Sequence, residues 1–125
     1  MRIQQAVAGI VMILALFAAG CVTLMSSGLT VAGGDTVIYR CEKGDLITAK
    51  YYRLSDHSLN FVKVTMPDGQ EYTLPQVVSA SGARYTDEHQ LVWWIKGGVA
   101  LVEALDENGK WQIKYRNCEA ISGAE

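Results

Sequence analysis

Two histidines stand next to acidic residues, and this arrangement is the first in the chain that could do chemistry. The pairs are Asp56-His57 and Glu88-His89, and the serines that could join them are Ser55, Ser79 and Ser81. A Ser-His-Asp triad needs these residue types, because the histidine takes the proton of the serine nucleophile. No Gly-x-Ser-x-Gly turn supports such a triad, and no segment singles out a carboxylate pair of the glycosidase type. We therefore interpret both pairs as surface loop residues and expect no enzyme.

Patterns for other ligands are missing from the sequence. It has no glycine-rich phosphate loop and no basic strip with interleaved aromatic residues. The net charge is −2 for all 125 residues, and it becomes −3 once Arg2 is removed with the N-terminal segment described below. A weakly acidic chain is a poor candidate for nucleic acid and a better one for a basic partner. We expect neither nucleic acid nor a cofactor.

The segment SASGARYTDEHQLVWWIKGG, residues 79–98, has the least ordinary composition in the chain. Its simplest interpretation is structural: a turn at Ser81-Gly82, then a hydrophobic strand that ends at a solvated Lys96. Adjacent strand residues point to opposite sides. We therefore expect one of Trp93 and Trp94 in the core and the other over an outer face.

Apolar residues recur with a period of two through the rest of the chain, which is typical of β-strands. Turn signals separate these runs at Pro67-Asp68-Gly69, Gly97-Gly98 and Asn108-Gly109. The predicted strands are 36–41, 45–52, 58–66, 70–78, 90–96, 99–105 and 110–116, and a short helical turn could form near 53–58. Seven or eight short strands joined by short turns predict an all-β fold, a sandwich or a small antiparallel barrel.

The first twenty residues have the layout of a secretory signal peptide. Arg2 precedes an uncharged apolar run from Ala6 to Ala19 that is short for a membrane span. The run ends in Ala18-Ala19-Gly20-Cys21, which resembles a bacterial lipobox with Ala18 in the place of the usual leucine. In such a motif the cysteine is lipidated and becomes the first mature residue. The alternative is an ordinary signal peptide with an incidental cysteine.

This interpretation divides the chain into three parts. We predict a lipoprotein signal peptide at 1–20, a lipidated N-terminus and tether at 21–34, and a folded domain at 35–125. The residue after the cysteine is Val22 and not an aspartate. By resemblance to other bacterial lipoproteins, this favours the outer membrane over the inner one. We expect a protein anchored by lipid to the bacterial outer membrane and facing the periplasm.

With Cys21 lipidated, two cysteines remain near the ends of the domain. The periplasm is oxidising, so an even pair there predicts a disulfide between Cys41 and Cys118. It would close a loop of 77 residues, which the chain-entropy model values at roughly 4–5 kcal/mol. A metal site is the alternative, but there is no Cys-x-x-Cys and only His57 and His89 could assist. We predict no metal.

Two motifs within 79–98 resemble the bacterial inhibitors of c-type lysozyme, the membrane-bound and periplasmic MliC/PliC family. The family's Ser-Gly-x-x-Tyr motif is complete at 81–85. Its Tyr-x-x-x-Thr/Ser-Lys-Gly motif is partial, because Leu91 replaces the tyrosine and Ile95 the threonine or serine, while Lys96-Gly97 is intact. The loop 86–90 is slightly longer than the common form. With the two cysteines and the turn at 66–69, the resemblance covers essentially all of 35–120.

The resemblance implies a barrel of about eight antiparallel strands with one disulfide. It also implies inhibition of c-type lysozyme by a loop that enters the active-site cleft, with Ser81 and Lys96 as the inserting residues. Arg84 and Tyr85 would shape the loop, line its rim or contact the partner. The expected lysozyme-binding residues are Ser81, Gly82, Arg84, Tyr85, Lys96 and Gly97. Lysozymes of this type are basic, so a mature charge of −3 would assist encounter in a salt-dependent way.

Two other functions stay open. One is a carrier of a small ligand in the barrel lumen, although a barrel this short should be filled with side chains. The other is a structural or assembly lipoprotein of the outer membrane that binds a neighbour through the barrel edge. An assay of lysozyme activity would separate both from an inhibitor. The sequence gives no indication of the oligomeric state.

Overall fold

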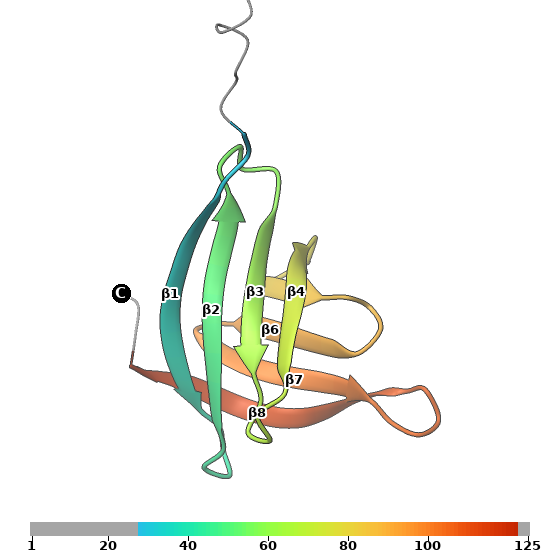
Figure 1. Ribbon diagram of the computed structural model, residues 1–125. Coiled ribbons are helices and arrows are strands. Elements are labelled where there is room, and N and C mark those ends of the chain that lie inside the picture. Colours follow the sequence, from blue (N-terminus) through green and yellow to red (C-terminus); the bar gives the residue numbers. More distant parts are fainter. Residues whose placement is uncertain (1–27, 123–125) are drawn as a thin grey trace, which may run out of the picture.

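The computed structural model describes residues 28–122, which form eight antiparallel strands. Each strand pairs with the next along the chain, and β8 returns to β1, so the sheet is a closed barrel. Figure 1 shows β1–β4 side by side, with β6–β8 crossing behind them at a steep angle. The strands are β1 (Val31–Arg40), β2 (Leu46–Leu54), β3 (Asn60–Thr65), β4 (Glu71–Val77), β5 (Ala83–Thr86), β6 (Leu91–Lys96), β7 (Val99–Leu105) and β8 (Trp111–Ser122). The predicted all-β barrel is confirmed.

The period-two pattern of the sequence becomes the inside and outside of the barrel. In β2, Ile47 and Ala49 are fully buried, whereas Leu46 and Lys50 on either side of them are exposed. The interior is filled by side chains from all eight strands and the segments next to them: Val37, Tyr39, Cys41, Ile47, Ala49, Val62, Val64, Met66, Leu74, Tyr85, Leu91, Trp93, Ala100, Val102 and Cys118. These side chains fill the lumen of the barrel, which argues against a ligand carrier of the lipocalin kind.

Three segments differ from the strand prediction. Residues 83–86 form a strand, β5, although the sequence indicated a loop there. Residues 55–58 form a turn, in which the Ser58 N–H donates to the Asp56 carboxylate at 3.0 Å, and not a helical turn. Strand β8 continues past residue 116 to Ser122. Its register with β7 shifts near Asn117, whose φ is 52°, but the strand does not end there.

Strand β1 also begins earlier than expected, at Val31 rather than near residue 36. Gly33 and Gly34 lie in the strand at φ 97° and 99°, where the register with β2 shifts by a bulge. A Cβ atom at Gly33 would lie 2.6 Å from the Tyr51 carbonyl oxygen. Glycine is therefore needed for the close approach of two backbones, and these two residues belong to the sheet. The predicted signal peptide at 1–20, Cys21 and the tether up to residue 27 lie outside the described residues.

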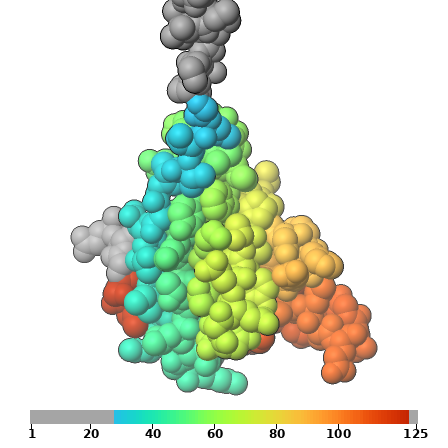
Figure 2. Space-filling view, viewed as in Figure 1, coloured from blue at the N-terminus to red at the C-terminus, as the bar shows by residue number. Residues whose placement is uncertain are grey.

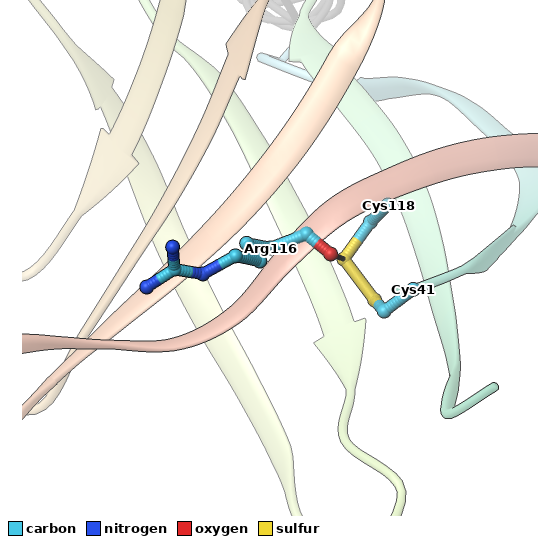
Figure 3. The surroundings of a disulfide bond; sticks show 3 residues. All are labelled: Cys41, Arg116 and Cys118. Carbon is cyan, nitrogen blue, oxygen red and sulfur yellow. Dashed lines mark hydrogen bonds between the residues drawn. A yellow bond between two sulfur atoms is a disulfide. The ribbon is translucent and has the colours of Figure 1, made fainter. Parts of the chain in front are cut away.

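The disulfide between Cys41 and Cys118 is present and joins the end of β1 to β8 (Figure 3). The Glu42 N–H donates to the Arg116 carbonyl oxygen at 3.0 Å beside it, and the Arg116 side chain points away from the sulfur atoms. The same oxygen lies 3.8 Å from the Cys118 sulfur. This contact is not a hydrogen bond, because a disulfide sulfur carries no proton. The pairing excludes the alternative in which these cysteines hold a metal.

The surface made by β1–β4 is continuous, and the β7–β8 hairpin extends beyond it (Figure 2). Within residues 28–122 no helix is long and apolar enough to cross a membrane.

Candidate functional site

Ser81 lies just before β5, Lys96 is the last residue of β6, and the two residues lie next to each other. Strand β5 pairs with β6 in the register Ala83↔Ile95, so the residues just before Ala83 run beside the end of β6. Both Ser81 and Lys96 are exposed. The structure thus brings the two residues singled out by the sequence to one rim of the barrel.

Gly82 makes this approach possible. Its φ is 67°, in the left-handed region, and a Cβ atom there would collide with the Ile95 carbonyl oxygen. Only glycine fits both the backbone angle and the space. Gly82 is therefore required for the close approach of the Ser81 loop to the end of β6.

The turn that carries Lys96 is as short as a hairpin allows. Lys96 pairs with Val99, and the two residues between them, Gly97 and Gly98, have φ values of 56° and 79°. Two positive φ values in a two-residue connection are the mark of a type I′ turn, which matches the twist of antiparallel strands. Lys96 is thus placed next to a two-residue hairpin turn and not on a long loop.

Trp94 contacts both residues. Its indole Nε1–H donates to the Ser81 carbonyl oxygen at 3.0 Å, and the Lys96 Nζ lies 3.8 Å from its ring centroid. The Ser79 hydroxyl donates to the same carbonyl at 2.6 Å. Trp93 is buried in the core and Trp94 lies on the outer face, as the sequence predicted for the pair. The contacts of Trp94 were not foreseen, although the spacing Trp94-x-Lys96 puts both residues on one face of a strand.

Arg84 lies on the same outer face, opposite Trp94 in the register. Its guanidinium carbon lies 5.5 Å from the Trp94 ring centroid, and its Nη1 lies 2.7 Å from the Glu88 carboxylate. Glu88 belongs to the loop 87–90, which connects β5 and β6. Arg84 is thus already engaged by two side chains of its own domain.

Tyr85 points the other way, into the core, where it is 8% exposed. Its ring centroid lies 5.8 Å from that of Tyr51, and burial raises the pKa of its phenol. The buried Tyr85 side chain therefore anchors β5, the strand that follows the Ser81 loop. Of the expected set, Ser81, Gly82, Lys96 and Gly97 gather at the rim, Arg84 lies on the adjoining face, and Tyr85 is inside.

The two departures from the family motif also lie away from the exposed residues. Leu91 is 3% exposed and belongs to the core, and Ile95 is partly buried against the same core. Both side chains therefore face the inside of the barrel, whereas Ser81 and Lys96 are exposed.

The His-acid pairs form no site. His57 lies in the β2–β3 turn and His89 in the β5–β6 loop, and both are exposed. In the β5–β6 loop, Asp87 accepts backbone N–H groups of His89 and Gln90; although burial opposes it, these bonds hold the pKa of the Asp87 carboxyl below its usual value. Across residues 28–122 there is no cluster of three or more His, Cys, Asp or Glu that could hold a metal.

The fold and the site together define a small disulfide-closed antiparallel barrel that presents a serine loop and a lysine hairpin on one rim. Residues 39–111 match the family model described as membrane-bound lysozyme-inhibitor of c-type lysozyme. This match spans more than half of the chain, so the chain belongs to that family. It is a family of inhibitors, in agreement with the expectation of no enzyme.

Named relatives agree with this assignment. The chain is 40% identical over 62 residues to a membrane-bound lysozyme inhibitor of C-type lysozyme from Pseudomonas aeruginosa, covering 50% of this chain and 46% of that protein. It is 36% identical over 80 residues to the inhibitor of the same name from Yersinia enterocolitica, covering 64% and 62%. The matched region thus spans about half to two thirds of these relatives' length.

A solved structure also resembles the barrel. It is the crystal structure of Pseudomonas aeruginosa MliC in complex with hen egg white lysozyme, with a TM-score of 0.53 and 25% sequence identity. The similarity covers 77% of this chain and 87% of that chain.

Proposed function

We propose that this domain inhibits c-type lysozyme by inserting the Ser81 loop and Lys96 into the enzyme's active-site cleft. One observation carries the proposal: Ser81 and Lys96 lie side by side on an exposed rim, in a chain of the lysozyme-inhibitor family. The Pseudomonas aeruginosa protein that resembles this barrel is described in complex with a lysozyme of this type. Membrane association is part of the same proposal, because the relatives are named membrane-bound inhibitors.

The chemistry of the target explains the two residue types. Lysozyme cleaves its polysaccharide with two carboxyl groups that face each other in a cleft. An ammonium group on a flexible stem can meet the ionised carboxylate, and a hydroxyl, which both donates and accepts, can meet the other carboxyl. Within residues 28–122, Lys96 has no ion pair to a carboxylate of its own domain, so its charge is available to a partner.

The backbone around Ser81 is held before any partner binds. Trp94 and Ser79 both donate to its carbonyl oxygen, while its own side chain is exposed. A loop that is fixed in advance loses less conformational entropy on binding. A protein side chain in the place of the sugar offers no glycosidic bond, so the cleft is blocked and the inhibitor is not cleaved.

The test is inhibition of a c-type lysozyme by the lipid-free domain and its variants. Truncating one partner of a buried charge pair costs about 2–5 kcal/mol, so Lys96→Ala should weaken inhibition about 30-fold or more. Ser81→Ala should cost less, about 1–2 kcal/mol, because a neutral hydroxyl bonds more weakly. Lys110→Ala, at the exposed β7–β8 turn, is the matched control and should leave inhibition unchanged.

Inhibition by Lys96→Ala equal to that of the unaltered domain would reject the insertion of Lys96. Failure of the unaltered domain to inhibit would reject the function itself, and an assembly role would then take its place.

The anchor belongs to the proposal as well. Cys21, at the end of the lipobox-like segment, would carry the lipid, and the residues between it and β1, 22–30, would reach from the outer membrane to the barrel on the periplasmic side. Labelled palmitate should be incorporated into the unaltered protein and not into Cys21→Ser. Equal incorporation in both would contradict lipidation at this residue.

A further inference from the structure

We propose that Trp94 is the positioning residue of the inhibitory rim, holding the Ser81 loop and the Lys96 side chain in one geometry. This inference rests on the proposed function and deepens it. Trp94 reaches both residues at once: its Nε1–H meets the Ser81 carbonyl oxygen at 3.0 Å, and its ring lies 3.8 Å from the Lys96 Nζ.

The bond to Ser81 joins a loop to a strand. Ser81 lies in the loop before β5, whereas Trp94 lies in the middle of β6, paired on both sides with Arg84 and Leu101. Its backbone is therefore fixed by two ladders. The loop has no ladder partner at Ser81, so this indole bond and the Ser79 hydroxyl determine where the Ser81 backbone stands.

The contact with Lys96 acts on a side chain that would otherwise be free. A lysine stem has several rotatable bonds, and an aromatic face attracts the ammonium group. With one side of the ammonium on the ring, its remaining N–H groups can still point to a carboxylate. The ring thus limits the directions of Lys96 without neutralising its charge.

Arg84 fits the same arrangement. Its guanidinium also approaches the Trp94 ring, at 5.5 Å, but is tied to Glu88 at 2.7 Å. The pair keeps the cation of Arg84 turned toward the 87–90 loop, and it leaves Lys96 as the cation beside Ser81.

Two substitutions separate the two contacts, and a third is the control. Trp94→Phe keeps an aromatic face but removes the N–H donor, and it should weaken lysozyme inhibition about three- to tenfold. Trp94→Leu removes both, and it should weaken inhibition a further two- to fivefold. Trp111→Phe makes the same chemical change at the opposite end of β7, where Trp111 pairs with Leu105, and should change inhibition less than twofold.

The decisive measurement repeats the first two substitutions in Lys96→Ala. Without an ammonium to position, Trp94→Leu and Trp94→Phe should cost the same. If the difference between them persists, the ring contacts lysozyme directly and the positioning role is wrong. Tighter inhibition by Trp94→Leu would also overturn it, since the ring would then be holding Lys96 back from the cleft.

A second readout needs no lysozyme. The Lys96 ε-methylene protons should show an upfield ring-current shift in NMR spectra of the free domain, retained in Trp94→Phe and lost in Trp94→Leu. An unshifted signal in the unaltered domain would contradict the contact. Should Lys96→Ala itself inhibit normally, the proposed insertion of Lys96 fails; should it fail to inhibit while both Trp94 variants inhibit normally, only the role of Trp94 fails.

Discussion

At the scale of single residues, the site depends on a glycine as much as on the residues that would meet a partner. Gly82 lies against the Ile95 carbonyl oxygen with φ 67°. Any other residue there would push the Ser81 loop away from β6 and from the Trp94 indole. In the Ser81-Gly82 motif, the serine thus supplies the hydroxyl, and the glycine determines where the Ser81 loop lies.

Gly82→Ala should therefore cost more than a left-handed backbone alone. A non-glycine residue at such a φ costs roughly 1–2 kcal/mol, and the collision with Ile95 adds to this, so we expect a loss of about 3 kcal/mol in the free energy of unfolding. Gly98→Ala is the matched control, because Gly98 has φ 79° but nothing near its missing Cβ. Urea unfolding of both variants checks the difference. Equal losses would mean that the loop can move away from β6 at no cost.

At the scale of the elements, the β5–β6 hairpin carries almost the whole site. Thr86 ends β5 and is 1% exposed. Its hydroxyl donates to the Leu91 carbonyl oxygen at 2.7 Å and accepts the Glu88 N–H at 2.9 Å. One buried side chain thus closes the four-residue connection 87–90, and it gives two backbone groups their hydrogen-bond partners.

Thr86→Val keeps the shape of this side chain and removes both bonds. A buried backbone group left without its partner costs about 1–3 kcal/mol, so we expect the unfolding free energy to fall by about 2 kcal/mol. Thr73→Val, on the exposed face of β4, should stay within about 0.5 kcal/mol of the unaltered domain. Thermal and urea unfolding provide the measurement. No loss in Thr86→Val would show that water replaces the hydroxyl.

The sequence predicts the long elements well and the short ones poorly, for physical reasons. Alternation over six or more residues identified β2 and β3, and glycine signals identified the β3–β4, β6–β7 and β7–β8 turns. Strand β5 has four residues, too few to show a period of two, and its pairing with β4 rests on only two register pairs, Gln76↔Tyr85 and Val77↔Arg84. Its existence depends on tertiary contacts that no local pattern contains.

The candidate site shows the same limit. Ser81 and Lys96 came from a resemblance, and their adjacency follows from the β5–β6 register. The contacts of Trp94 follow from the path of the Ser81 loop, which Gly82 and Ile95 determine together. A sequence pattern could place Trp94 and Lys96 on one face, but it could not bring the carbonyl of Ser81 to the indole.

At the scale of the whole molecule, the barrel closes at a short seam between its first and last strands. Strands β1 and β8 share three register pairs, with a shift between them. The disulfide between Cys41 and Cys118 lies at this seam and spans 77 residues of sequence. In the chain-entropy model a loop of that length contributes roughly 4–5 kcal/mol, so the bond compensates for the short ladder.

The core beneath the site contains a hydrogen-bonded group of aromatic residues. The Tyr39 and Tyr51 hydroxyls lie 2.8 Å apart, and the Trp93 Nε1–H donates to the Tyr51 oxygen at 3.0 Å. Tyr85 packs beside them. Burial raises the pKa of all three phenols above the usual value of 10.0, and at Tyr51 the bond to Tyr39 raises it further. These residues connect β1, β2, β5 and β6, so their protonation affects the barrel as a whole.

The domain should therefore lose stability in alkali. Because the phenol pKa values are raised in the folded state, their stabilising effect is complete below about pH 10 and is lost as the pH rises above that. Each phenol that stays protonated in the fold lowers the unfolding free energy by up to about 1.4 kcal/mol per pH unit there. Urea unfolding between about pH 8 and pH 11 should show this fall. The loss should be reversed on return to neutral pH, which separates it from chemical damage to the disulfide.

Tyr51→Phe should be less stable than the unaltered domain at neutral pH, and its unfolding free energy should fall less steeply in alkali. Tyr72→Phe, whose hydroxyl donates to Gln70 outside the core, should keep the steep fall. Parallel curves for Tyr51→Phe and the unaltered domain would assign the alkaline loss to other groups.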